Sequence, residues 1–148
     1  MIRISTKGRY GTRAMLDLAL NHERGLVLLK DIAERQEISI GYLEQIIPSL
    51  KTAGLVNSSR GAHGGYTLSK LPSEITLKEI ISALEGPLSL VECIKDPKIC
   101  EKTDYCITRN LWDELSEKID DFLVSVTLQQ LVEKHRIKQK GRPLMYSI

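Results

Sequence analysis

The chain has 148 residues, of which 42% are hydrophobic and 27% charged, and its formal net charge is +2. This composition is ordinary for a soluble globular protein of one domain, or of one small domain with an extension. No apolar run is long enough to cross a membrane and the first residues lack the apolar core of a signal peptide, so a cytoplasmic protein is expected. Residues 1–70 hold ten Lys and Arg against six Asp and Glu, a balance of +4, whereas residues 71–148 hold eleven against thirteen, a balance of −2.

A first helix is predicted near the N-terminus. Ser5 or Thr6 can cap it, and its pattern runs to about His22. The helix carries the basic residues Lys7, Arg9 and Arg13 nearly on one face, and Lys7 and Arg9 are the candidate DNA contacts. A basic helix face is ordinarily only solvated, but beside a unit that reads DNA it favours contact with phosphates.

Two further helices are predicted before residue 54. Residues 27–35 indicate a short second helix, and Ser39 is a good N-cap for a third, whose apolar residues recur at spacings of three and four. Pro48 should bend the third helix, and Gly54 should end it. The polar face of the third helix carries Gly41, Tyr42, Glu44, Gln45, Ser49 and Lys51. Two short helices, a tight turn and a helix with a polar outer face are typical of a helix-turn-helix.

A β-hairpin is predicted directly after these helices. Residues 55–60 and 66–69 are strand-like, and a glycine-rich connection joins them. A hairpin in this place predicts a winged helix, with Arg60 and Gly61 in the wing and Arg60 suited to a minor groove or to phosphates. The glycines alone could mean only a tight turn, and His63 is interpreted as an exposed loop histidine rather than a ligand.

The second half of the chain begins at a joint near Pro72. A capping box at Thr76 opens a fourth helix over residues 77–85, and a second capping box at Thr127 opens a short helix to about His135. Residues 136–148 are polar and basic, and a mobile tail is expected there.

A long helix is predicted between these two, starting at Cys106. Its apolar residues step by three and four along an otherwise charged helix. This seam consists of Trp112, Leu115, Ile119, Phe122 and Val126. Pairing with the same helix of a second copy is the favoured interpretation, and packing against its own chain is the alternative.

All three cysteines of the protein lie in one polar stretch: Cys93, Cys100 and Cys106. The stretch is charged and contains a proline, which is typical of a loop, and three thiols in a short loop can converge on one point. Thiolates are the ligands that zinc and iron–sulfur clusters prefer. Unconnected thiols or a transient disulfide remain open, and the spacing alone does not distinguish zinc from iron–sulfur.

Several short motifs together carry a family resemblance, which extends to about Lys134. They are residues 5–10 (STKGRY), 14–19 (AMLDLA), 38–45 (ISIGYLEQ), 54–56 (GLV), 60–66 (RGAHGGY) and 107–112 (ITRNLW), together with the three cysteines. In these residues the chain resembles the IscR-like iron–sulfur cluster transcriptional regulators of the Rrf-two superfamily. The resemblance implies a homodimeric winged-helix protein that holds a 2Fe–2S cluster and often represses genes for cluster assembly.

Site residues follow from this resemblance by position. It places Ser39, Gly41, Tyr42, Glu44 and Gln45 on the DNA-reading helix, Arg60 and Gly61 on the wing, and Cys93, Cys100 and Cys106 on the metal. The chain departs from the family at Arg109, where the family has a histidine as fourth ligand, and a guanidinium is a poor iron ligand. Glu92, Glu101 and Asp104 are local candidates for the missing ligand.

The expected fold is mainly α with a small β-wing. A winged helix-turn-helix should span residues 1–72, a connecting helix, the cysteine loop and a dimerisation helix should span 73–135, and the polar tail 136–148. The expected function is sequence-specific binding of double-stranded DNA, controlled by the cluster. A cluster-free regulator of the same fold, controlled by thiol oxidation, zinc or a partner protein, is the alternative. A small redox enzyme is disfavoured, because the chain has no Cys-x-x-Cys pair.

Overall fold

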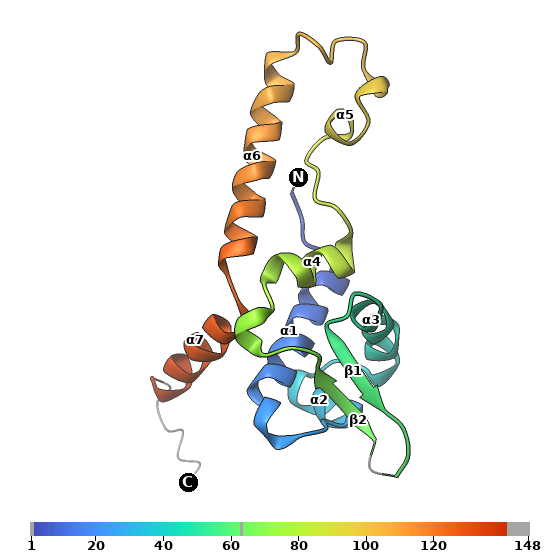
Figure 1. Ribbon diagram of the computed structural model, residues 1–148, viewed down its shortest axis with the longest axis vertical. Helices are drawn as coiled ribbons and strands as arrows, with labels where there is room; N and C mark the ends of the chain where they lie inside the picture. The colour runs from blue at the N-terminus through green and yellow to red at the C-terminus, as the bar shows by residue number, and fades with distance from the viewer. Residues whose placement is uncertain (1, 63, 142–148) are drawn as a thin grey trace.

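The computed structural model describes residues 2–62 and 64–141, and it is mainly helical with one small sheet (Figure 1). In chain order the elements are α1 (Thr6–Leu20), η1 (His22–Arg24, a 3-10 helix), α2 (Leu29–Gln36), α3 (Ile40–Thr52), β1 (Val56–Ser59), β2 (Gly65–Leu68), η2 (Pro72–Glu74), α4 (Leu77–Glu85), α5 (Glu92–Lys95), η3 (Pro97–Ile99), α6 (Ile107–Ser125) and α7 (Leu128–Lys140). The predicted fold class, mainly α with a β-hairpin after the third helix, is confirmed. No helix in the described part of the chain is long and apolar enough to span a bilayer.

Side-chain caps start most of the long helices where the sequence predicts. The hydroxyl of Ser5 accepts from the Gly8 amide and that of Ser39 from the Tyr42 amide. Helix α4 opens on the predicted capping box at Thr76, and α7 on the one at Thr127. Each cap satisfies an amide that the first helical turn leaves unpaired.

Helix α2 begins at Leu29, two residues later than predicted, because Val27 is held in an extended conformation. The Val27 amide donates to the Tyr66 carbonyl at 2.9 Å, and the Tyr66 amide donates back at 2.8 Å. This bridge adds a short edge to the antiparallel hairpin, in which Val56 pairs with Leu68 and Ser59 with Gly65.

Helix α3 contains Pro48 and continues past it to Thr52, and Gly54 follows in the left-handed region with φ of 75°. Helix α7 runs to Lys140, so the prediction that it ends near His135 is wrong. The predicted tail is therefore helical up to Lys140, because residues 136–140 contain neither Gly nor Pro and the last turn holds basic side chains that suit a helix C-terminus. Residues 142–148 lie outside the described part.

One hydrophobic core unites α1, α2, α3, α4, both strands and α7, and we call this unit the body. Helices α1 and α4 pack closely because α1 carries glycines at the contact. A Cβ added at Gly11 would meet the Leu84 side chain, and one at Gly8 would meet the carboxylate of Glu85. The amide and hydroxyl of Ser5 donate to that same Glu85 carboxylate, which ties the start of α1 to the end of α4.

A buried carboxylate fixes the helix-turn-helix within the body. Asp17 on α1 is 1% exposed, and it accepts from Arg35 Nε at 2.9 Å and Nη2 at 2.7 Å. Gln36 Nε2 donates to the same carboxylate at 3.0 Å. These charge-assisted bonds hold the end of α2 against α1, and so set where the turn into α3 begins.

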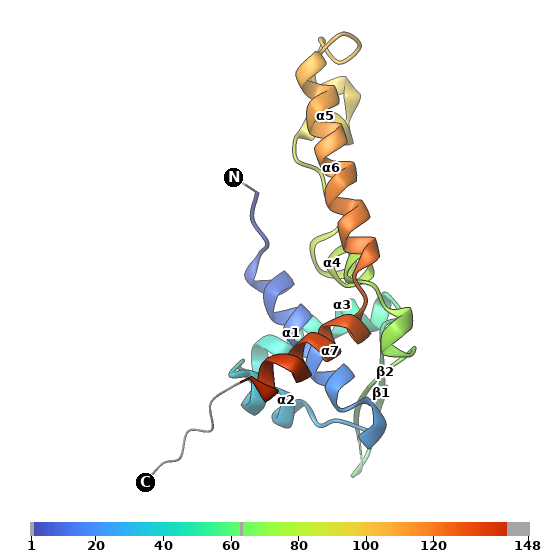
Figure 2. The ribbon, with the colours of Figure 1, turned by 90° about the vertical axis from the view of Figure 1, so that its left-hand side faces the viewer.

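A long projection, which we call the arm, stands away from the body and comprises residues 87–125 with α5, η3 and α6 (Figures 1 and 2). The chain enters the arm after the end of α4, and it returns to the body beside the start of α4. Thr76 and Thr127 form a β-bridge, in which the Leu77 amide donates to the Val126 carbonyl at 2.8 Å and the Leu128 amide to the Ile75 carbonyl at 2.9 Å. Beside this bridge Lys78 pairs with Asp120 of α6.

Candidate functional site

The candidate reading surface is the outer face of α3. Its inner face is anchored in the core by Leu43, Ile46, Ile47 and Leu50. The outer face presents Gly41, Glu44 and Gln45 to solvent, and Ser39 is also exposed. The structure thus places these four predicted residues on one accessible surface, at the first turns of a helix whose other side is rigidly packed.

Tyr42 differs from its predicted neighbours on this face, because its ring is half-buried and packs against the core. It meets the ring of Tyr10 edge-to-face, with centroids 5.5 Å apart and planes at 81°. Tyr42 therefore also fixes the start of α3 against α1, a second role that the helical spacing did not reveal.

The two basic residues predicted on α1 lie in different surroundings. Lys7 Nζ donates to Ser49 Oγ at 3.1 Å, which brings its ammonium group beside α3. Arg9 is exposed, and its Nη2 donates to Thr6 Oγ1 at 3.1 Å within the first turn of α1. Only Lys7 is thus joined directly to the reading helix.

The predicted wing is the hairpin of β1 and β2, which projects from the body beside α3 (Figure 1). Arg60 and Gly61 follow β1 and are both exposed, and Gly61 has a φ of 106°, which favours glycine. A Cβ at Gly64 would lie 2.5 Å from the Ser59 carbonyl oxygen, so this tight turn requires a glycine there. His63 lies outside the described residues.

The three cysteines lie on three successive elements of the arm. Cys93 is in α5, Cys100 follows η3, and Cys106 is the N-cap residue of α6. All three are free thiols of intermediate exposure. Within residues 2–62 and 64–141, however, no three His, Cys, Asp or Glu side chains are close enough together to hold a metal ion. The expected convergence of the thiols is thus not seen.

Local hydrogen bonds explain how this loop is held. The Thr103 hydroxyl donates to the carbonyls of Pro97 and Cys100, at 2.8 and 2.7 Å, and the Asp96 carboxylate accepts from the Lys98 amide at 3.0 Å. These bonds stabilise compact turns on both sides of Cys100 without drawing the three sulfur atoms to one point.

Arg109 lies against the first cysteine. Its Nε donates to the carbonyl of Cys93 at 3.3 Å, which ties α5 to the first turn of α6. The thiol of Cys106 accepts or donates a hydrogen bond with the Thr108 hydroxyl at 3.3 Å, and this contact, with the Arg109 amide second, lowers the pKa of Cys106. The donor set fits a soft metal centre, since it consists of free thiols with one already biased toward thiolate.

An apolar strip runs along α6 and is only partly covered by the rest of the chain. Phe122 is 63% exposed, Trp112 39% and Leu115 38%, and Ile119 is half-buried. Val126 is different: it is 8% exposed and sits at the joint, so it packs within its own chain rather than on the open strip. Exposed Ile107 and Leu111 extend the strip toward the cysteines, and their spacing of four from Leu115 could have revealed them.

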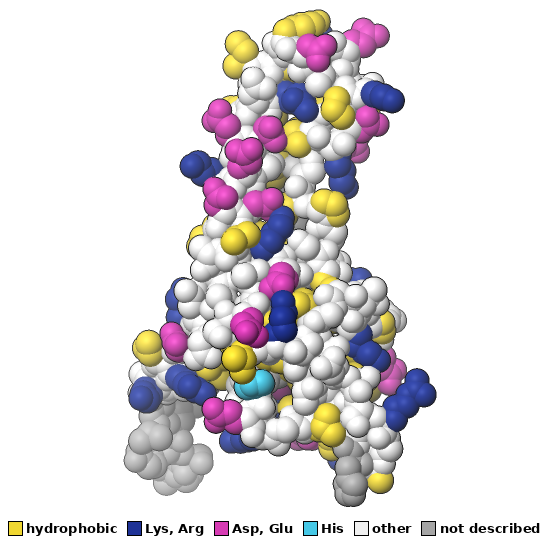
Figure 3. Space-filling model, in the orientation of Figure 1, with side chains coloured by type: hydrophobic (Ala, Val, Ile, Leu, Met, Phe, Trp, Pro, Cys, Tyr) yellow, Lys and Arg dark blue, Asp and Glu magenta, His cyan; other side chains and the backbone are white. Residues whose placement is uncertain are grey.

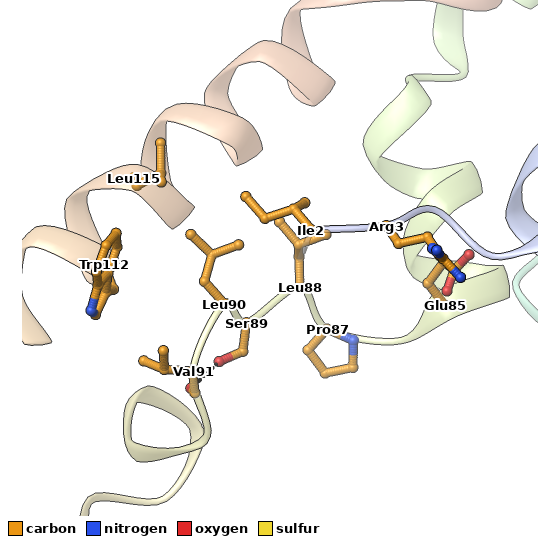
Figure 4. Close-up of a pocket in the computed structure, with 10 residues that line it drawn as sticks. All are labelled: Ile2, Arg3, Glu85, Pro87, Leu88, Ser89, Leu90, Val91, Trp112 and Leu115. Carbon is orange, nitrogen blue, oxygen red and sulfur yellow. Dashed lines mark hydrogen bonds between the residues drawn. The ribbon is translucent and has the colours of Figure 1, made fainter.

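The strip borders a recess of about 450 Å³ at the base of the arm. Figure 4 shows Ile2, Leu88 and Leu90 facing the side of α6 that carries Trp112 and Leu115. The N-terminal segment and the linker after α4 thus form an apolar wall opposite α6.

The arm and the body differ in surface charge. On the face shown in Figure 3, acidic side chains gather along α6. They belong to a helix with Asp113, Glu114, Glu117, Asp120 and Asp121. An acidic arm is repelled by phosphates, so an anionic polymer is directed to the more basic body.

Comparisons with known proteins agree with this geometry. Residues 4–134 match the Rrf2 (Rrf-two) family, described as iron-dependent transcriptional regulators. The HTH-type transcriptional regulator IscR of Klebsiella pneumoniae is 46% identical over 136 residues, covering 92% of this chain and 83% of the relative.

Solved structures give the same result. IscR of T. potens superimposes with a TM-score of 0.78 and 39% identity, over 98% of this chain and 96% of the other. CymR, the global cysteine regulator of B. subtilis, has a TM-score of 0.76 and 43% identity, over 90% and 98% of the two chains. The fold, the reading helix, the hairpin and these matches together show that the chain belongs to the Rrf2 family of transcriptional regulators.

Proposed function

We propose that this protein is a homodimeric, sequence-specific DNA-binding regulator in the cytoplasm whose binding is controlled by a 2Fe–2S cluster. The observation that carries the DNA-binding part is the exposed polar start of α3 beside a glycine-dependent hairpin. A helix fits the major groove, and an arginine at a hairpin tip fits the adjacent minor groove.

Different side chains of α3 would contact different bases. Gln45 can form two hydrogen bonds with adenine, and Glu44 accepts from the amino group of cytosine but is repelled by phosphate. Ser39 and Gly41 let the helix start approach the base edges, since both are exposed and small. Arg60 and Gly61 supply the wing contact, and Lys7 and Arg9 supply phosphate contacts from α1.

The dimer is proposed on the apolar strip of α6. Trp112, Leu115, Ile119 and Phe122 expose more apolar surface than a solvated helix requires. The same strip on a second copy is self-complementary, as a two-fold interface requires. Two reading helices would then meet two half-sites at a fixed separation.

The sulfur atoms of Cys93, Cys100 and Cys106 would hold the cluster. When bound, it would supply a centre that responds to oxygen, iron supply or redox state. The arm connects this region to the body through the joint at Thr76 and Thr127. A rearrangement of the loop therefore reaches α6, and with it the separation of two reading helices. Repression of iron–sulfur assembly genes is the proposed output.

A second candidate is a cluster-free regulator that responds through its thiols, through zinc or through a partner protein. Two observations favour it: the thiols are free and do not meet as a ligand set in the described residues, and the pKa of Cys106 is lowered. The likeness to a regulator named for cysteine adds a third.

The test is purification without oxygen, followed by iron and sulfide analysis and DNA binding with and without the bound centre. Duplexes selected by the wild-type protein from a random pool serve as probes. We expect visible absorption in the wild-type protein, no absorption in Cys100→Ala, and a change in affinity or site preference when the cluster is removed. A colourless protein with stoichiometric zinc, or binding that ignores iron, would favour the second candidate.

A further inference from the structure

A polar recess of about 440 Å³ lies between the hairpin and the helices behind it. Its walls come from three elements: the start of α2, the last turn of α3 and the hairpin. The polar and charged residues that line it include Lys51 of α3, Ser58 and Ser59 of β1, and Arg60. Arg60 is predicted in the wing from its place in the sequence, whereas no sequence motif assigns a function to Lys51 or to the two serines.

Close backbone contacts give this recess its shape. The Val27 and Tyr66 backbones pair behind it, and a Cβ at Gly65 would lie 2.8 Å from the Val27 carbonyl oxygen. Gly64 is equally restricted by the Ser59 carbonyl oxygen, at 2.5 Å. The glycines therefore do more than allow a turn: they let the hairpin approach the body and fix the width of the hollow.

The charge of the lining favours an anion. The lining contains the two cations Lys51 and Arg60, and no Asp or Glu belongs to it in the described part of the chain. Both cations are exposed, and neither forms a salt bridge within residues 2–62 and 64–141. Ser58 is also exposed, and its side chain lies on the same face of β1 as buried Val56, toward the body, so its hydroxyl can donate to an anionic oxygen.

The position of the recess identifies the anion. Lys51 follows Glu44 by seven residues on α3, so both lie on the same exposed side of the helix. If α3 enters a major groove and the hairpin the neighbouring minor groove, one sugar–phosphate strand must pass between them, and the recess lies in that gap. We propose that it binds a phosphodiester of that strand, held by Lys51 and the Ser58 hydroxyl, with Arg60 at the edge. This assignment rests on the proposed DNA-binding function. It extends that function to a backbone contact that would fix where α3 and the hairpin lie along the duplex.

The test is the salt dependence of DNA binding, measured by fluorescence anisotropy between about 50 and 200 mM salt. The probes are a duplex selected by the wild-type protein and a scrambled duplex of the same length. Each lost phosphate contact lowers the slope of log affinity against log salt by about one, so Lys51→Gln should lower it by about two in a dimer. Both duplexes should bind roughly tenfold more weakly, with little change in their ratio. Ser58→Ala should weaken both duplexes less and leave the slope unchanged.

Lys51→Arg, which keeps the charge, should retain the slope, and Lys138→Gln on exposed α7 is the matched control. Thermal unfolding of every variant checks that the fold is intact. An unchanged slope in Lys51→Gln, or loss confined to the selected duplex, would overturn the assignment while the DNA-binding function stands. A wild-type protein that selects no sequence would overturn the function itself.

Discussion

The body takes its core from α1, α2, α3, α4, both strands and α7, whereas α6 contributes no side chain to it. Within α6 only Ser116 and Leu123 are buried, although the helix has 19 residues. Most of the stabilisation of the body comes from apolar burial inside one chain. The arm exposes an apolar strip instead, so burial within the chain stabilises the arm less than the body. The comparison teaches that the body is packed within one chain, whereas the arm leaves an apolar surface that the proposed dimer would cover.

The largest expected difference between the body and the arm is in the effect of a Leu→Ala substitution on the free energy of unfolding. Leu43 of α3 is fully buried, so Leu43→Ala should lower the free energy of unfolding by about 2–5 kcal/mol, through lost burial and a residual cavity. Urea denaturation of dilute protein measures it. Leu111→Ala removes the same atoms from a side chain that is 53% exposed, and in dilute protein should change the free energy by less than about 0.5 kcal/mol. Equal effects at the two leucines would contradict the contrast between body and arm.

A charge on the open strip should act on assembly rather than on folding. Phe122→Asp places a carboxylate where the partner helix would pack, and should give monomers by sedimentation. Loss of the second half-site should then weaken binding to a selected duplex by roughly 100-fold. Val124→Asp is the matched control, because Val124 is similarly exposed, at 55%, but faces the other side of the helix. A Phe122→Asp variant that stays dimeric would place the interface elsewhere.

The smallest effect is expected at the joint between the two regions. Burial opposes the ionisation of Glu79, but hydrogen bonds from Lys70 and Thr76 outweigh it and lower the pKa of Glu79. A carboxylate with a lowered folded pKa stabilises the fold above its unfolded pKa, and this stability is lost as the pH falls through the folded pKa. Glu79→Gln should therefore lower stability by about 0.5–1 kcal/mol at neutral pH, and the difference should vanish in acid.

The matched control for this variant is Glu117→Gln, on the exposed surface of α6. It should change stability by less than about 0.5 kcal/mol. Thermal unfolding across a pH series measures both variants. A Glu79→Gln deficit that persisted unchanged in acid would show that the hydrogen bonds to Glu79 do not depend on its charge.

The sequence predicted the helix starts well because its signals are local. Ser5, Ser39, Thr76 and Thr127 cap within one turn of themselves, and the structure uses each of them. It could not predict the late start of α2, which depends on pairing with Tyr66 far along the chain. Helix α5 and η3 were also missed, because elements of four and three residues are too short to show a helical period.

The candidate site also has features that the sequence predicted and features that it could not predict. The polar face of α3 followed from its spacing, since one side of a packed helix must face water. The half-buried ring of Tyr42 and the burial of Val126 did not, because each depends on another part of the fold. The cysteines were identified by type, but the hydrogen bonds of Thr103 and Arg109 that hold their loop have no sequence signature. The Lys51 recess needs three separate elements to form, so no single motif could reveal it.

The β-bridge between Thr76 and Thr127 has a mechanical consequence. Because it joins the first turns of α4 and α7, it fixes the C-terminal end of the arm to the start of α4, the helix whose other end leads into the arm. The arm therefore cannot tilt without a movement of α4 and α7, two helices of the body. A displacement of the arm near Cys106 would shift α4 and α7 together. It would also move these two helices relative to α1, because α1 packs on both.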